Sequence, residues 1–220
     1  MSSYISKNKR KTPLLHSLLP TSHSPLFNTI WLEWLFVTFI GFLASLFWIE
    51  IGEKPDIGGL QGLVGGAMVG LAQLLVLRRY ISQAGWWILA SSLSWSFIGL
   101  SPLGAMGWVA PRTLEIIPRL LYGIVGGGII GMLLGVGQWL VLRQHISKAW
   151  QWIFVNTLSW SIALALGWII GGILRLVTRL FISEVIGLAV TWILVGTMTG
   201  LALIKFLENT KPRKQPTTKN

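Results

Sequence analysis

Long uncharged stretches alternate along this chain with short segments that carry its charges. Each stretch lacks Asp, Glu, Lys and Arg, and the six of them cover residues 34–49, 57–77, 80–111, 120–142, 149–174 and 185–204. A helix needs about 20 residues to cross the roughly 30 Å hydrocarbon core of a bilayer. Strands of a membrane barrel would instead be about 10 residues long with alternating polarity. The pattern predicts an all-α integral membrane bundle of six transmembrane helices, the first starting near Ile30.

The composition agrees with a membrane protein rather than a soluble one. Of the 220 residues, 53% are hydrophobic and 11% are charged, whereas a soluble domain carries about 25% charge. The 25 Gly and 13 Trp also fit, since Gly is frequent in transmembrane helices and Trp concentrates at membrane interfaces. A formal charge of +11 would suggest nucleic acid as a partner of a soluble protein, but here the positive charges flank apolar stretches. We therefore expect the lipid bilayer as a partner and no nucleic acid.

The distribution of Lys and Arg predicts the orientation in the membrane. With six spans, both tails and the turns after the second and fourth spans lie on one side and carry 13 of the 18 positive residues. The positive-inside rule then places both termini in the cytoplasm. The predicted organisation is a cytoplasmic tail over residues 1–29, a transmembrane domain over 30–207 and a basic cytoplasmic tail over 208–220, with both tails disordered.

One segment of the chain occurs twice. Residues 73–96 are QLLVLRRYISQAGWWILASSLSWS and residues 138–161 are QWLVLRQHISKAWQWIFVNTLSWS, identical at 14 of 24 positions. Each copy holds two spans, so the copies share one orientation in the membrane. The fold is therefore predicted to consist of about three two-helix repeats with a 65-residue period. The first span would complete the unit that the sixth begins, which closes a ring.

Glycines in the second, fourth and sixth spans follow the same period. They are Gly62, Gly66, Gly70, Gly127, Gly131, Gly135, Gly196 and Gly200. Glycines at i, i+4 and i+8 lie along one face of a helix. In lipid no hydrophobic force drives helices together, so close backbone approach at small residues matters more. We predict that these eight glycines line the contacts between helices.

Four residues within the spans are candidates for a ligand site or a pore. Gln73 and Gln138 either line a polar path or bond to neighbouring helices, as polar residues in membrane bundles do. Trp95 and Trp160 lie deeper in their spans, where they either pack in the bundle or form a pocket for a hydrophobic ligand. Both interpretations stay open for each pair.

Arg78 and Arg143 end the second and fourth spans, and we interpret them as interface anchors that contact lipid headgroups. The chain has no Cys, and its three His lie outside the spans. No predicted span carries a carboxylate at its centre, although intramembrane charge usually marks proton or ion pathways. We therefore predict no enzyme activity, no catalytic residue, no metal site and no cofactor.

The repeated segment also carries a family resemblance. GLAQLLVLRRYISQAGWWILASSLSW and GVGQWLVLRQHISKAWQWIFVNTLSW resemble a family of repeat-bearing multi-pass membrane proteins common in cyanobacteria. Its pattern is roughly G-x-x-Q-W-L-V-L-R, a short polar turn and then W-W-I. The resemblance covers about residues 59–167, with Leu74 where the family has Trp and with Ser94 and Ser159 where it has Gly. It implies a location in the cell inner membrane or the thylakoid and no particular activity.

Three functions are compatible with these observations. The absence of a catalytic constellation and the closely packing helices favour a non-enzymatic membrane protein with an assembly, stabilising or scaffold role towards other membrane components, which can include other membrane proteins. The first alternative is a small-solute channel or carrier, whose axial path Gln73 and Gln138 would line. The second alternative is a lipid- or pigment-binding protein, with the ligand held between Trp-rich helices.

Overall fold

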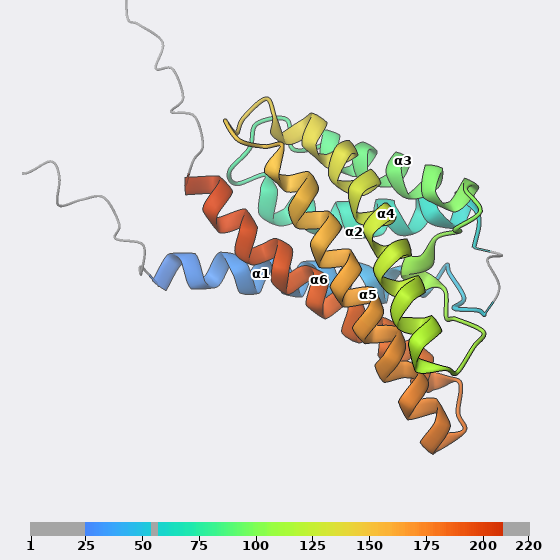
Figure 1. Ribbon diagram of the computed structural model, residues 1–220. Coiled ribbons are helices and arrows are strands. Elements are labelled where there is room, and N and C mark those ends of the chain that lie inside the picture. The colour runs from blue at the N-terminus through green and yellow to red at the C-terminus, as the bar shows by residue number, and fades with distance from the viewer. Residues whose placement is uncertain (1–24, 54–56, 209–220) are drawn as a thin grey trace, which may run out of the picture.

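The computed structural model describes residues 25–53 and 57–208, and these residues form an all-α fold. The tails predicted over residues 1–29 and 208–220 lie outside the described residues, apart from 25–29, which α1 includes, and Glu208, which ends α6. The described elements (Figure 1) are α1 Pro25–Ser45, α2 Gly59–Leu77, α3 Trp86–Leu100, the 3₁₀ helix η1 Met106–Trp108, α4 Ile116–Leu142, α5 Gln151–Thr178 and α6 Ile182–Glu208.

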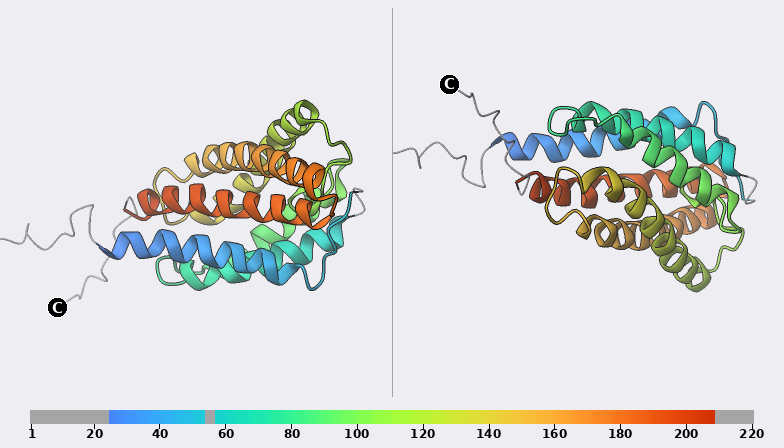
Figure 2. Two further views of the ribbon diagram at one scale, coloured as in Figure 1. Left: turned by 90° about the horizontal axis from the view of Figure 1, so that it is seen from below. Right: turned by 90° about the horizontal axis from the view of Figure 1, so that it is seen from above.

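The six helices form a ring in chain order. Each helix packs against the next, from α1 to α6, and α6 packs against α1. Trp31 on α1 donates a hydrogen bond from Nε1 to the carbonyl oxygen of Thr197 on α6, at 3.1 Å. The start of α1 and the end of α6 lie at the same end of the bundle (Figure 2). We call this the terminal end and the opposite one the loop end.

Four helices, α2, α4, α5 and α6, are long and apolar enough to cross a membrane. Their number and composition support the prediction of a multi-pass helical membrane protein. The prediction of six full-length spans is met only in part, because the apolar part of α1, Thr29–Ser45, and α3 are shorter than the other four. With 15 residues, α3 is about 22 Å long, which is less than the roughly 30 Å of a bilayer core.

The helix α3 is short because its uncharged stretch divides into a helix and a loop. The helix ends at Leu100, and Ser101 is extended with ψ at 164°, the conformation favoured before a proline such as Pro102. Residues 105–110, which we call the plug loop, are all buried. The uncharged stretch 80–111 therefore contains one helix of 15 residues and a buried loop.

Tryptophan side chains of the ring fix the plug loop at the loop end. Trp108, within the plug loop, donates from Nε1 to Ser45 Oγ on α1 at 2.7 Å. Trp168 on α5 donates from Nε1 to the carbonyl oxygen of Val109 at 3.1 Å. The plug loop therefore contacts helices from both halves of the chain.

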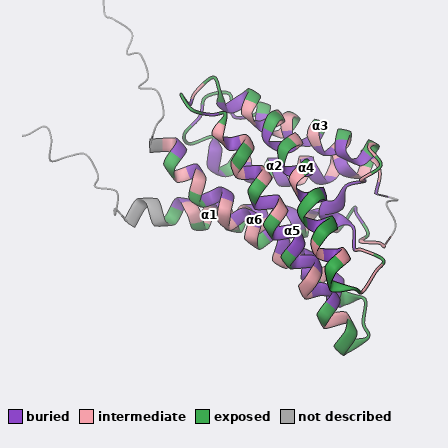
Figure 3. Cartoon of the chain, in the orientation of Figure 1, coloured by how far each residue is buried: buried purple, intermediate pink, exposed green. Residues whose placement is uncertain are grey.

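The outer surface of the ring is apolar. Buried and exposed residues alternate along each helix, since one face turns inward and the other outward (Figure 3). Exposed apolar side chains occur on every helix, among them Phe36, Leu60, Leu71, Leu93, Phe97, Val125, Phe154, Leu158, Ile186 and Leu201. Such a surface suits contact with lipid tails.

The glycines of the 65-residue period lie where helices meet. A β-carbon added to Gly62 on α2 would lie 2.3 Å from the carbonyl oxygen of Trp95 on α3. One added to Gly127 on α4 would lie 2.3 Å from the carbonyl oxygen of Trp160 on α5. The other members of the set face the same partner helices, or α1 in the case of α6: Gly66, Gly70, Gly131, Gly135, Gly196 and Gly200. Close helix approach depends on the missing side chain at these positions.

Candidate functional site on the axis of the ring

Three tryptophans occupy the axis of the ring near its terminal end. Trp34 on α1, Trp87 on α3 and Trp152 on α5 are each at most 1% exposed. Their ring centroids lie 5.9–6.4 Å apart, and all three pairs meet edge to face, the geometry that aromatic quadrupoles favour. This terminal aromatic layer fills the centre of the ring with side chains from three alternate helices.

The two glutamines connect the terminal aromatic layer to the neighbouring helices. Gln73 Oε1 accepts from Trp87 Nε1 at 2.9 Å, and Gln73 Nε2 donates to Thr38 Oγ1 on α1 at 3.0 Å. Each interaction joins a different helix to α2. The buried glutamine therefore acts as a link among α1, α2 and α3.

The second glutamine makes the same kind of connection one period later. Gln138 Oε1 accepts from Trp152 Nε1 at 2.8 Å, and Gln138 Nε2 donates to Ser91 Oγ on α3 at 3.2 Å. Both glutamines are buried and use their oxygen and their nitrogen within the protein. Of the two interpretations of Gln73 and Gln138, this geometry matches bonding between helices.

The third position of the ring departs from this pattern. One period after Gln138 the chain has Leu203, which cannot hydrogen-bond. Trp34 Nε1 donates instead to Thr199 Oγ1 on α6 at 3.0 Å. Asn156 Nδ2 turns back to the carbonyl oxygen of Trp152 at 3.0 Å. Leu203 is thus accompanied by different hydrogen bonds at the same level of the axis.

A second aromatic layer lies towards the loop end. Trp95, Trp160 and Trp192, from α3, α5 and α6, have centroids 5.0–6.0 Å apart. Trp108 of the plug loop lies 4.7 Å from Trp95, centroid to centroid, and Phe42 of α1 lies 5.4 Å from Trp192. Trp95 and Trp160 are each 2% exposed, so both are part of the packed interior.

Trp192 also connects the loop-end layer to the plug loop. Its Nε1 donates to the carbonyl oxygen of Gly107 at 3.0 Å. A β-carbon on Gly107 would lie 2.8 Å from the Trp95 ring and 3.2 Å from the Trp192 ring. The plug loop therefore needs glycine at this position to approach the aromatic layer closely.

A small cavity lies between the two aromatic layers. Its volume is about 20 Å³, and it is lined by both layers and by Gln73, Gln138, Ser91, Asn156 and Thr199. One water molecule needs roughly 10–15 Å³ of such space and two to four polar partners. The cavity therefore has the size and chemistry for about one water molecule, and the tryptophans fill the axis on either side of it.

A buried ion pair joins α4 to α6 at the loop end. Arg119 Nη2 lies 2.6 Å from Glu184 Oε1, and Arg119 Nη1 lies 2.9 Å from Glu184 Oε2. The two side chains are 0% and 1% exposed. Such a two-bond contact between guanidinium and carboxylate is among the strongest polar contacts in proteins.

The remaining donors of Arg119 bind backbone oxygens. Nε donates to Thr113 at 2.6 Å, Nη1 to Trp168 at 2.5 Å and Nη2 to Pro111 at 3.3 Å. The arginine thereby connects α4 and α6 to α5 and to the segment that follows the plug loop. Every guanidinium nitrogen has a partner, as a buried charge requires.

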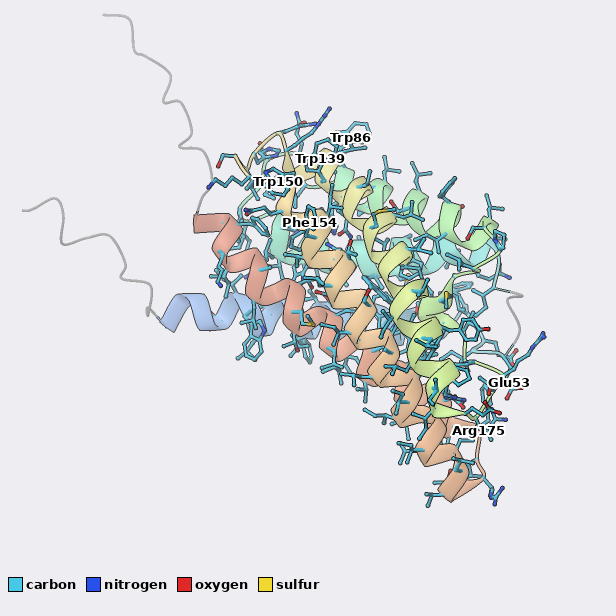
Figure 4. All side chains as sticks on the ribbon, viewed as in Figure 1. Glu53, Trp86, Trp139, Trp150, Phe154 and Arg175 are labelled. Carbon is cyan, nitrogen blue, oxygen red and sulfur yellow. The ribbon has the colours of Figure 1, made fainter. Side chains whose placement is uncertain are left out.

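The ion pair extends to the surface through a second arginine. Arg175 Nη1 lies 3.5 Å from Glu184 Oε1 and also contacts Glu53. Figure 4 shows Arg175 and Glu53 side by side at the loop end. Sequence reasoning missed this cluster because it treated Arg119 and Glu184 only as boundaries of uncharged stretches. The available signal was their separation of 65 residues, which places them at equivalent positions of the period.

The predicted anchors lie at the terminal end. Arg78 and Arg143 are exposed residues that directly follow α2 and α4. The guanidinium carbon of Arg143 lies 5.1 Å from the centroid of the Trp139 ring. Figure 4 shows Trp86, Trp139, Trp150 and Phe154 gathered at this end. Arginine beside aromatic rings is a typical arrangement at a membrane–water boundary.

Among the described residues there is no group of three or more His, Cys, Asp or Glu side chains that could hold a metal ion. Comparison with protein-family models, curated proteins and solved structures gives no match for this chain. The functional argument therefore depends on the geometry of the ring and its surfaces.

Proposed function

We propose that this chain is a non-enzymatic membrane protein that assembles with other membrane proteins and stabilises them through the outer surface of its ring. The observation that carries the proposal is the filled axis. Two aromatic layers and the plug loop occupy the centre, and the axial glutamines bind to the protein's own helices. Side chains available to other molecules lie on the apolar outside.

We further propose that the ring arose from tandem copies of one two-helix unit. The paired hydrogen bonds of Gln73 with Trp87 and of Gln138 with Trp152 support this, since both pairs are 14 residues apart. The equal approach of Gly62 and Gly127 to their partner helices is a second support. Membership in the cyanobacterial repeat family is part of the same proposal.

The proposed orientation has both termini in the cytoplasm, with the terminal end of the ring facing that side. The excess of Lys and Arg in the tails and in the turns after α2 and α4 supports it. In this arrangement α1 and α3 cross the membrane together with α2, α4, α5 and α6. The location would be the cell inner membrane or the thylakoid.

Photo-crosslinking from the outer surface tests the proposed assembly. A photoreactive phenylalanine analogue replaces Phe36, Val125 or Phe154, which are 64%, 61% and 60% exposed and lie on three different helices. Irradiation in native membranes should give adducts with other proteins from at least one position. The same analogue at half-buried Leu194, which packs against the inner core, serves as the control with few adducts.

Two outcomes would overturn the proposal. One is adducts with lipid alone from all three outer positions, together with isolation of the chain as a lone protein in mild detergent. The other is solute flux in liposomes that Gln73→Leu or Gln138→Leu abolishes while the protein stays folded. That second result would instead support the axial channel.

A further inference from the structure

An apolar groove opens on the outer surface between α3 and α4. Its volume is about 490 Å³. The walls are formed mainly by Leu89, Leu93 and Phe97 of α3 and by Leu133, Val136 and Leu140 of α4. The only polar side chains that line it are Ser94 and Gln144. Water would find few hydrogen-bond partners in such a groove, whereas a hydrocarbon chain would bury apolar surface along its whole length.

The length of the groove along the helices matches the thickness of the hydrocarbon in one lipid leaflet. It runs from Trp86 and Gln144 at the terminal end to Phe97 and Leu133. The 11 helical steps from Trp86 to Phe97 correspond to about 16 Å. Half of a bilayer core is about 15 Å. A single acyl chain that enters at the terminal-end interface would therefore extend along the groove towards the middle of the bilayer.

Two turns that carry basic residues adjoin the mouth of the groove, although no Lys or Arg lines the groove itself. Gln144 follows Arg143 in the turn after α4, and Ser82 Oγ lies 2.9 Å from His145 Nε2, which brings the turn after α2 alongside it. These two turns, residues 78–85 and 143–150, contain four Lys or Arg residues and no Asp or Glu. Among the described residues, neither Arg78 nor Arg143 forms an ion pair. A phosphate at the mouth would therefore lie beside two turns that carry positive charge and no carboxylate.

A second groove provides an internal comparison. The groove on α1 and α6 has almost the same volume, about 500 Å³, and is lined by Leu32, Glu33, Leu35, Phe36, Phe39 and Ile193. Its one charged lining residue is Glu33, whose carboxylate lies 2.6 Å from Arg79. Apolar volume alone would make the two grooves equivalent for lipid tails. The lining distinguishes them, because the carboxylate of Glu33 lines the α1–α6 groove and no carboxylate lines the α3–α4 groove.

We propose that the α3–α4 groove is a binding site for an anionic phospholipid. One acyl chain lies along Leu89, Leu93 and Leu140, and the phosphate lies at Arg143 and Gln144 beside the Trp86 ring. The apolar walls favour an acyl chain, and the positively charged turns beside the mouth favour a phosphate. This site does not require a protein partner, so it stands apart from the proposed assembly.

Lipid retention by the full chain tests the site. The protein is placed in mixed micelles with equal amounts of phosphatidylglycerol and phosphatidylcholine, and bound lipid is identified by native mass spectrometry. We expect one phosphatidylglycerol to be retained in preference to phosphatidylcholine. Arg143→Gln should reduce that preference about fivefold, because one basic residue near the surface contributes about that much to binding an anionic lipid.

Matched variants separate the two ends of the site and the two grooves. Leu93→Trp places a larger ring in the α3–α4 groove and should reduce retention of both lipids. Phe36→Trp and Glu33→Gln change the α1–α6 groove and should leave the preference intact. Because Arg143 is exposed, Arg143→Gln keeps the test valid even if Leu93→Trp impairs folding.

A photoreactive acyl chain on phosphatidylglycerol locates the lipid directly. Crosslinks should fall on residues 86–97 and 133–144. Equal retention of the two lipids by the unchanged protein would overturn the proposal, as would an unchanged preference in Arg143→Gln. Crosslinks concentrated on α1 and α6, or displacement of the lipid by a protein seated in the groove, would overturn it as well.

Discussion

The hairpins α2–α3 and α4–α5 share their inner contacts and differ at the loop end. In each hairpin a buried glutamine accepts from the indole nitrogen of a tryptophan 14 residues later, at 2.9 and 2.8 Å. In each, a glycine approaches the carbonyl oxygen of a later tryptophan equally closely. Yet α3 ends at Leu100, whereas α5 continues to Thr178. The same local sequence therefore specifies the same packing, and the divergence begins where the sequences diverge.

At the loop end the chain continues differently after α3 and after α5. After α3 the chain enters the ring as the plug loop, and Trp108 binds Ser45. After α5 the chain turns directly into α6, and Glu184 binds Arg119 at the start of α4. The first solution fills the axis with aromatic side chains, and the second joins three helices through a buried charge. Substitutions at matching positions of the two hairpins test whether both hairpins contribute equally to stability.

The largest effect is expected from leucine at the closest glycines. Gly62→Leu and Gly127→Leu each force a side chain against backbone that lies 2.3 Å from the new β-carbon, so both should abolish the monodisperse peak in detergent size-exclusion chromatography. Gly85→Ala is the control, because nothing lies within 4 Å of that position. A folded protein from only one of the two leucine variants would show that the hairpins are not equivalent.

The buried ion pair should give the next largest effect. Arg119→Met leaves Glu184 buried without its main partner and should reduce the free energy of unfolding by about 3–5 kcal/mol. Arg79→Gln breaks the exposed pair with Glu33 and should cost at most about 1 kcal/mol.

Unfolding in mixed micelles with rising denaturing detergent measures both changes. The double variant Arg119→Met, Glu184→Leu removes both charges and should recover part of the loss. Equal stability of Arg119→Met and Arg79→Gln would contradict the role assigned to the buried pair.

The axial glutamines should give an intermediate and equal effect. Gln73→Leu and Gln138→Leu each remove two hydrogen bonds and leave an indole nitrogen unpaired, at a cost of about 1–3 kcal/mol. Thermal unfolding in detergent, followed by the near-ultraviolet circular dichroism of the tryptophans, reports the change. Unequal losses would mean that Thr38 and Ser91, the other partners, do not support their glutamines equally.

The smallest effect concerns two serines at matching positions. Ser159 Oγ is buried and has no hydrogen-bond partner among the described residues, whereas Ser94 is half-buried and lines the α3–α4 groove. Ser159→Ala should therefore leave the melting temperature unchanged or raise it, with a gain of up to about 1 kcal/mol in the free energy of unfolding. Ser94→Ala should leave it unchanged. A clear loss in Ser159→Ala would reveal a partner for that hydroxyl.

The sequence was sufficient for features that depend on local periodicity. Glycines four residues apart must share a helix face, and their recurrence after 65 residues identified contacts that Gly62 and Gly127 make with their partner helices. Bonding between helices was one of two interpretations for Gln73 and Gln138. It required the structure to identify Trp87 and Trp152 as the partners.

Features that depend on contacts distant in sequence were not predictable. The stretch 80–111 has no charge to mark the point where a helix gives way to a loop, and the local signs were Pro102 and Pro111. The plug loop is stable because Trp168 and Trp192, far along the chain, bind its carbonyl oxygens. Arg119 and Glu184 appear as surface charges in a linear pattern, since only the ring brings them together.

The plug loop also determines when the fold can be completed after synthesis. Residues 105–110 emerge from the ribosome long before Trp168 and Trp192, which bind the carbonyl oxygens of Val109 and Gly107. Until α5 and α6 have been inserted, those oxygens lack the donors that bind them in the finished ring. The ring is incomplete at that stage. Completion of the loop end therefore waits for the last helix, which makes the seating of this loop a natural final step of biogenesis.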